Sequence, residues 1–403
     1  MTTNKKIVLA YSGGLDTSYC IPYLREKKGF EVITVTVDTG GFSPAELTEI
    51  EDRANDLGVL EHHTVDGRSR VFDNYVSYLI KGNVLRGGVY PLAVAAERVV
   101  QAEMIAEVVR EIGADAVAHG STGAGNDQVR FDIAFSVLLP GIEVLTPIRD
   151  EKLSRDEEYD FLVERGVNIN KTLREYSINS GLWGATIGGG ETHDPWKSIP
   201  ESVYEQAVDT PKADAEETVV VSYEKGVPVA LDNRPVGGVE LIEQLGEKCR
   251  AHRVGLGIHI GDTVLGIKGR IAFEAGVAQV LIHAHRELEK IVLTGWQRFW
   301  KDHVAEFYGK LIHEGNAFDP VLRDIEALID SSQERLTGDA RICLRDGNYV
   351  VEGVESPYNV MQAAAGVYGE MPKLWTGEDV RGFSTITSVP SRLYRQAGSE
   401  GQD

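Results

Sequence analysis

The 403-residue chain has few cysteines, an excess of acidic over basic residues, and no long hydrophobic run. Its three cysteines, Cys20, Cys249 and Cys343, lie far apart and form no C-x-x-C pair, which argues against a disulfide framework or a zinc knuckle. No apolar run approaches the roughly 18 residues of a membrane span, and the N-terminal segment has no signal-peptide core. We therefore expect a cytoplasmic protein without a membrane partner.

The charge balance limits the kinds of partner. Lys and Arg number 41 against 62 Asp and Glu, which gives a net charge of −21 and opposes binding to nucleic acid. Small molecules are therefore the expected partners. His283 and His285 have no third ligand at metal-site spacing, so no protein-bound metal is predicted.

Strand-like and helix-like segments alternate through the first 165 residues. The strand-like segments are residues 6–11, 32–37, 61–65, 114–119 and 143–146, and the helix-like ones are 17–28, 44–57, 70–79 and 93–112. This order predicts an α/β domain with an open, mostly parallel sheet covered on both faces. Its ligands should lie at the carboxyl ends of the strands.

The stretch A-Y-S-G-G-L-D-T-S, residues 10–18, follows the first of these strands and begins the first helix. Two adjacent glycines permit a tight turn, and three hydroxyl side chains lie beside the free amides of the helix start, which favours phosphate binding. The stretch lacks both the lysine of a Walker loop and the spacing of a dinucleotide loop. Asp16 within it suggests a magnesium-bound nucleotide. A Gly-Gly turn capped by Ser and Asp is the alternative.

A second glycine-rich stretch, G-S-T-G-A-G-N-D-Q-V-R, covers residues 120–130. It combines a hydroxyl, an amide, a carboxylate and a guanidinium, at Thr122, Asn126, Asp127 and Arg130. A carboxylate suits an α-ammonium group and the donors suit a carboxylate, so the stretch fits an amino acid better than a phosphate. The alternative is a turn capped by Asn126 or Asp127, with Arg130 on a solvated helix face.

The first stretch resembles the signature loop of the N-type ATP pyrophosphatases, which hold the leaving pyrophosphate of ATP. With the second stretch, the resemblance narrows to the argininosuccinate synthase family and covers most of the chain. It implies the ATP-dependent ligation of citrulline and aspartate to argininosuccinate through a citrullyl-adenylate, with release of AMP and pyrophosphate. ATP is then a substrate that carries Mg²⁺. Two alternatives are another N-type ATP pyrophosphatase, adenylating a carbonyl or amide substrate, and a non-catalytic nucleotide-binding protein.

The resemblance also implies roles for individual residues. Asp16 and Asp127 are predicted to be catalytic, the first through the metal-nucleotide complex and the second by orienting the amine of aspartate and helping to remove its proton. The residues predicted to bind ATP are Ala10, Tyr11, Ser12, Gly13, Gly14, Leu15, Asp16, Thr17, Ser18 and Gly120. Those predicted to bind aspartate are Thr122, Asn126 and Asp127, and those predicted to bind citrulline are Tyr90, Asn126, Arg130, Ser177 and Thr186.

Three positions depart from the family pattern. Where the family has a serine, a glutamate and a tyrosine that contact citrulline, this chain has Ala95, Gly261 and Phe273. Either Asp262 and Glu274 supply the missing polar contacts, or the outer end of citrulline is held differently. The glycines at residues 188–190 predict a mobile connection.

The second half is predicted to be a separate α+β domain. Hairpin patterns occur at residues 218–231 and 340–354, and helical patterns at 239–251, 276–291 and 295–313. The expected organisation is an ATP-binding domain at 1–165, a synthetase and multimerisation domain at 166–355, and a tail at 356–403. In the family such a tail crosses to neighbouring subunits of a homotetramer.

Overall fold

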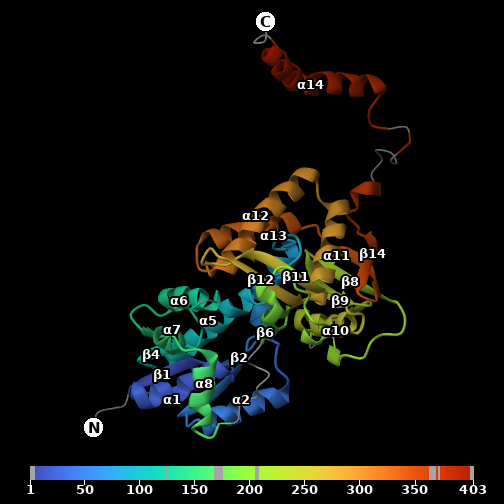
Figure 1. Ribbon diagram of the computed structural model, residues 1–403. Coiled ribbons are helices and arrows are strands. Elements are labelled where there is room, and N and C mark those ends of the chain that lie inside the picture. The colour runs from blue at the N-terminus through green and yellow to red at the C-terminus, as the bar shows by residue number, and fades with distance from the viewer. Residues whose placement is uncertain are drawn as a thin grey trace. The chain divides into compact units, whose positions relative to one another are not determined.

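The computed structural model describes residues 5–123, 125–167, 176–204, 208–362, 369–370 and 373–399 (Figure 1). The chain divides into two compact units, Met1–Ser356 and Pro357–Asp403. The larger unit contains three β-sheets, and the smaller one consists mainly of a single helix.

The first sheet has five parallel strands in the order β3-β2-β1-β4-β5, which confirms the predicted α/β domain. Its strands are β1 (Lys6–Ala10), β2 (Glu31–Asp38), β3 (Glu61–Asp66), β4 (Ala116–His119) and β5 (Glu143–Leu145). The strand order reverses between β1 and β4. The loops after these two strands therefore leave the same edge of the sheet side by side, where ligands of such sheets bind.

Helices cover both faces of this sheet. Successive residues of β1 point to opposite faces: Ile7 and Leu9 belong to one buried core and Val8 and Ala10 to the other. The helices of this region are α1 (Leu15–Pro22), α2 (Pro44–Asp56), α3 (Arg68–Val71), α4 (Ser77–Lys81), α5 (Ala95–Ile112), α6 (Asp127–Leu138), α7 (Pro147–Glu151) and α8 (Arg155–Val163). Short π-helical turns extend α1 and join α3 to α4.

A four-stranded antiparallel sheet follows, in the order β11-β12-β7-β6. Its strands are β6 (Tyr176–Gly181), β7 (Gly184–Gly189), β11 (Leu256–Asp262) and β12 (Lys268–Glu274). The predicted mobile connection at the glycines is wrong, because Gly188 and Gly189 pair with Ser177 and Tyr176 inside β7 and β6. Glycine-rich strands lack the β-branched pattern that identifies a strand in sequence, and the pairing partners order them instead.

The third sheet, in the order β10-β9-β8-β13-β14, contains both predicted hairpins. Its strands are β8 (Glu217–Glu224), β9 (Val227–Leu231), β10 (Arg234–Pro235), β13 (Gly338–Arg345) and β14 (Asn348–Glu355). The accompanying helices are α10 (Gly238–Ala251), α11 (Gly276–Val292), α12 (Gly295–Glu314) and α13 (Val321–Gln333). The turn residues Lys225 and Gly226 both have positive φ, as a tight hairpin requires.

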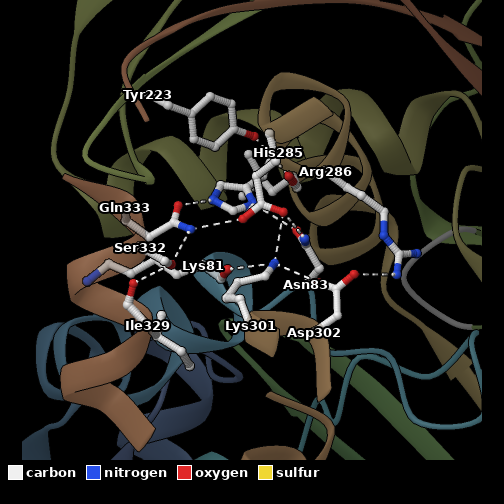
Figure 2. A network of polar contacts seen from close by, with 12 residues as sticks. Lys81, Asn83, Tyr223, His285, Arg286, Lys301, Asp302, Ile329, Ser332 and Gln333 are labelled. Atoms are coloured by element: carbon white, nitrogen blue, oxygen red, sulfur yellow. Dashed lines mark hydrogen bonds and ion pairs between the residues drawn. The ribbon is translucent and has the colours of Figure 1, made fainter. Parts of the chain in front are cut away.

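A buried polar network joins α11, α12 and α13 to the segment after α4 (Figure 2). The Glu289 carboxylate accepts hydrogen bonds from Lys301 at 2.8 Å, from Asn83 at 2.6 Å and from Gln333 at 2.9 Å. His285 lies in the same network, hydrogen-bonded to Asn83 and Gln333. Since Asn83 comes from the first half of the chain and its partners from the second, the network fixes the two halves of this unit together.

The smaller unit contains a short 3₁₀ turn (Val360–Gln362) and helix α14 (Gly377–Ser399). Several apolar side chains of α14 are exposed, including Phe383, Ile386 and Leu393. No helix in the described ranges is long and apolar enough to cross a membrane.

Candidate active site

The first glycine loop connects β1 directly to α1. Gly13 has φ of +71°, and a Cβ on it would lie 2.7 Å from Ile50, so only glycine fits this turn. α1 begins at Leu15 without a side-chain cap, so no side chain occupies the amides of its first turn. Ser12 is exposed, and its hydroxyl lies 3.2 Å from that of Thr17. The loop thus presents amides and hydroxyls together, as an anion site at a helix start does.

The second loop touches the first. A Cβ on Gly120 would lie 3.0 Å from Thr17 Cγ2 and 3.2 Å from the Thr17 amide, so glycine permits the approach. The two loops therefore lie side by side, which follows from the neighbouring positions of β1 and β4.

Asp16 lies in the first turn of α1 beside Glu158 of α8. Burial, the negative charge of Asp16 and a hydrogen bond with Asp16 raise the pKa of Glu158. The raised pKa favours the neutral form of Glu158 at its contact with Asp16. Nothing in the sequence marked Glu158, since its contact with Asp16 arises only from the packing of α8 on α1.

Asp127, the first residue of α6, is held by two arginines. Its Oδ1 accepts a hydrogen bond from Arg130 at 2.7 Å, and its Oδ2 accepts one from Arg98 at 2.9 Å. Burial opposes ionisation of this carboxyl, but the two guanidinium groups outweigh it and lower the pKa of Asp127 below its usual range. Sequence reasoning missed Arg98, because residues 93–112 were predicted only to form a helix. The one feature of the sequence that could have indicated Arg98 is its position, as a basic residue shortly after Tyr90.

Arg130 is buried and does not lie on a solvated helix face. Its Nε donates to the His313 carbonyl at 3.0 Å, and its Nη2 lies 3.2 Å from His313 Nδ1. Burial, together with the charges of Arg130 and Arg86, lowers the pKa of His313 to about 3. His313 is therefore neutral at physiological pH.

The other two residues of the predicted aspartate set lie in the same loop. Asn126 accepts a hydrogen bond from the Val264 amide at 2.9 Å, which ties the loop to the β11–β12 connection. Thr122 is half-buried.

The antiparallel sheet presents one face to Tyr90 and Arg98. The Tyr90 hydroxyl lies 2.9 Å from that of Thr186, and Arg98 donates to Asn179 at 2.5 Å. We call this the Thr186 face. By strand alternation and register, it also carries Ser177, His259, Gly261 and Phe273. The structure thus brings Tyr90, Ser177, Thr186 and Arg130 to one region, although they are separated by up to 96 residues of chain.

The register also places the residues that depart from the family pattern. The Phe273 ring centroid lies 5.5 Å from that of Tyr90, and Gly261 shares the Thr186 face with His259. Asp262 and Glu274 follow at the next positions and therefore project from the opposite face, where Asp262 pairs with Lys268. This register argues against the expectation that Asp262 and Glu274 take over the polar contacts. Ala95 is buried in the first turn of α5.

A two-layer arrangement thus emerges: a parallel sheet with its glycine loop at the switch point, and an antiparallel sheet facing it across Tyr90 and Arg98. It is the arrangement of a nucleotide-binding α/β protein with a second, antiparallel domain. Residues 6–168 match the family model described as the arginosuccinate synthase N-terminal HUP domain, and residues 176–394 match the model of its C-terminal domain. The chain belongs to the argininosuccinate synthase family, which confirms the resemblance inferred from the two loops.

Curated relatives match over almost the whole chain. The argininosuccinate synthase of Methanocaldococcus jannaschii is 40% identical over 351 residues, which cover 87% of this chain and 88% of that protein. That of Archaeoglobus fulgidus is 39% identical over 399 residues, covering 97% and 99%. That of Synechocystis sp. is 38% identical over 397 residues, covering 97% and 98%.

Proposed function

We propose that this chain ligates citrulline and aspartate to argininosuccinate, with ATP converted to AMP and pyrophosphate through a citrullyl-adenylate. The contact between Gly120 and Thr17 supports this most directly. It makes the phosphate-binding loop and the amino-acid loop neighbours. The proposed reaction requires this, because AMP is first joined to one amino acid and is then displaced by a second one.

In the first step, the ureido oxygen of citrulline attacks the α-phosphorus of ATP and pyrophosphate leaves. Residues 12–18 hold the departing pyrophosphate through the helix-start amides and the Ser12 and Thr17 hydroxyls. Asp16 is the carboxylate suited to the metal-nucleotide complex, and Mg²⁺, when bound, offsets phosphate charge. The described residues contain no group of three or more His, Cys, Asp or Glu side chains that could hold a metal without the nucleotide.

In the second step, the amine of aspartate attacks the adenylated carbon and AMP leaves. Asp127 orients this amine, with Thr122 and Asn126 beside it. A carboxylate whose pKa is lowered by two arginines is a weak base. Asp127 therefore binds and orients the amino group of aspartate; the ammonium gives one proton to solvent before the free amine attacks, and AMP leaves with the electrons of the C–O bond. Tyr90, Arg130, Ser177 and Thr186 hold citrulline.

We also propose a cytoplasmic homotetramer that binds small molecules and not nucleic acid. The net charge of −21 supports the last point. Exposed aromatic side chains on α12, at Trp296, Phe299, Trp300 and Phe307, support assembly, because they form a stripe at helical spacing.

The decisive measurement is pyrophosphate release with ATP, Mg²⁺, citrulline and aspartate. We expect release to need citrulline and to match argininosuccinate mole for mole. The Asp16→Ala variant should lose at least about 100-fold in rate, the size of a lost charge-assisted contact of about 3 kcal/mol.

The matched control is Asp52→Ala, which removes an exposed carboxylate on α2. It should leave the rate unchanged. Near-normal turnover by Asp16→Ala at limiting Mg²⁺ would contradict the assigned role. Release without citrulline would point to another N-type ATP pyrophosphatase, and no release under any condition to a non-catalytic nucleotide-binding protein.

A further inference from the structure

Arg53 lies on α2, beside the first glycine loop, residues 10–18. The other charged residues of α2 are all acidic. The Arg53 Nη1 donates a hydrogen bond to the Gly13 carbonyl. Ile50, one turn earlier on α2, lies against the same glycine, where a Cβ would meet its side chain. α2 therefore supports the loop at Gly13, and its one basic residue makes the polar contact.

The hydrogen bond from Arg53 orients a peptide group of the loop. In a trans peptide, the carbonyl group and the amide of the next residue point in opposite directions. Because the Gly13 carbonyl points to α2, the Gly14 amide points away from α2, where it lies 3.4 Å from the Ser12 hydroxyl. This amide adds to the free amides at the start of α1. Arg53 thus helps to shape the phosphate-binding side of the loop.

The guanidinium group of Arg53 has donors left for a ligand. It carries several N–H donors, and Gly13 accepts from only one of its nitrogens. Arg53 is half-buried, and it forms no ion pair with a carboxylate among the residues that the structure describes. Burial raises the pKa of Tyr11, and a hydrogen bond with Ser18 and the charge of Arg53 oppose this rise. A cation without a counter-ion therefore lies near the first turn of α1.

Arg53 and the second glycine loop lie on opposite flanks of the first loop. β2, which precedes α2, and β4, which precedes the second loop, pair with β1 on opposite sides. Accordingly, α2 contacts the first loop at Gly13, and the second loop contacts it at Thr17. In transfer at phosphorus, the attacking and leaving oxygens are roughly in line. An amino acid bound at the second loop attacks from one flank, so pyrophosphate leaves toward the other, where Arg53 lies.

We propose that Arg53 binds the departing pyrophosphate and supplies the cation that a Walker loop takes from its lysine. The inference rests on the proposed citrulline-dependent adenylation and names a residue that stabilises its leaving group. As the ureido oxygen bonds to the α-phosphorus, the bond from that phosphorus to the bridging oxygen breaks, and its electron pair goes to pyrophosphate. Arg53 offsets this negative charge and neither gains nor loses a proton.

Inhibition by the two products of ATP separates this role from mere support of the loop. Argininosuccinate formation is measured with citrulline, aspartate, excess Mg²⁺ and varied ATP, while pyrophosphate or AMP is added. In Arg53→Met, the inhibition constant of pyrophosphate should rise about ten- to a hundredfold, and that of AMP less than about twofold. Arg53→Lys should show a smaller rise for pyrophosphate, because an ammonium group keeps the charge but lacks the guanidinium fork.

The matched control is Arg25→Met. Arg25 also donates from its Nη1 to a backbone carbonyl, that of Leu57, at 2.9 Å. It lies in the π-helical turn that extends α1, at the end of the helix away from the glycine loop. Both inhibition constants should therefore stay unchanged in this variant.

The outcomes distinguish this inference from the proposed function. Unchanged inhibition by pyrophosphate in Arg53→Met, or an equal rise for pyrophosphate and AMP, would overturn the inference and leave the ligase function intact. If Arg53→Met does not fold, the same comparison in Arg53→Lys, which keeps the charge beside the loop, decides. Absence of citrulline-dependent product formation by the unchanged chain would overturn the proposed function, and the inference with it.

Discussion

Asp127 and its two arginines form the densest group of charges in the site. The carboxylate is shared between Arg98 of α5 and Arg130 of its own helix, at 2.9 and 2.7 Å. Arg130 is anchored further by the His313 carbonyl. This arrangement fixes the orientation of both guanidinium groups before any substrate binds, so that little reorganisation is needed during the reaction.

Replacement of Asp127 and of Arg130 should separate the two chemical steps. Asp127→Asn should keep ureido-dependent adenylation and lose argininosuccinate formation, because it removes the acceptor for the amine of aspartate. Arg130→Met should weaken the ureido substrate about ten- to a hundredfold and slow both steps, because it removes a charge-assisted donor. Positional isotope exchange in ATP without aspartate measures the first step alone.

The division of roles would be wrong if Asp127→Asn lost this exchange while Arg130→Met kept it. Since Arg130 is buried, the circular dichroism spectrum and melting temperature of each variant must first match those of the unchanged chain. Asp52→Asn, at an exposed position on α2, is the matched control for Asp127→Asn.

The turn between β6 and β7 docks on the first half of the chain. The Leu182 amide donates to the Thr39 carbonyl at 2.7 Å, and the buried Trp183 indole donates to the Pro91 carbonyl at 2.9 Å. Gly181 lies against the Glu97 carboxyl of α5, where a Cβ would overlap it. The turn therefore sets the distance between the Thr186 face and α5, and with it the spacing of the site.

Glu97 at this junction should make stability depend on pH. Burial raises its pKa to about 8 in the folded chain, against about 4.3 when unfolded. The folded state therefore binds one more proton between these values, and stability falls as pH rises from about 4 to 8. Glu97→Gln should remove this slope and stabilise the fold by up to about 2 kcal/mol at pH 8 relative to pH 6.

Urea unfolding of both proteins at pH 6 and pH 8 checks this prediction. Glu111→Gln is the control, because Glu111 is also on α5 but is exposed and lies away from the turn. Equal pH slopes for the Glu97→Gln variant and the unchanged chain would contradict the role given to Glu97.

Helices α12 and α14 each expose large apolar side chains. On α12, Trp296 is 76% and Phe299 58% exposed, and on α14, Ile386 is 74% exposed. Exposed aromatic side chains in a helical stripe are typical of surfaces that another chain covers. In the proposed homotetramer, such apolar areas would offset the repulsion between copies that each carry a net charge of −21.

Light scattering at micromolar concentration should give four times the 44.2 kDa mass of one chain. Phe299→Glu with Trp300→Glu should lower this mass, because each buries a charge at a subunit contact. Trp196→Glu, at a tryptophan that is 94% exposed and outside α12, should not. A monomeric mass for the unchanged chain would rule out the homotetramer.

The sequence by itself determined the parallel sheet and both hairpins of the third sheet. These features depend on local patterns, namely hydrophobic periodicity and turn glycines. The resemblance carried by residues 10–18 and 120–130 also identified the family, because the chemistry of each loop is concentrated in a few consecutive residues.

Only the tertiary structure decided what surrounds those loops. The contacts of Glu158 with Asp16 and of Arg98 with Asp127 join elements far apart in the chain, and no local pattern marks them. The antiparallel sheet was missed because its strands are glycine-rich and polar, so that pairing and not propensity forms them. Strand register decides which face of a sheet a residue lies on. The register places Gly261 and Phe273 on the Thr186 face, and Asp262 and Glu274 on the opposite face.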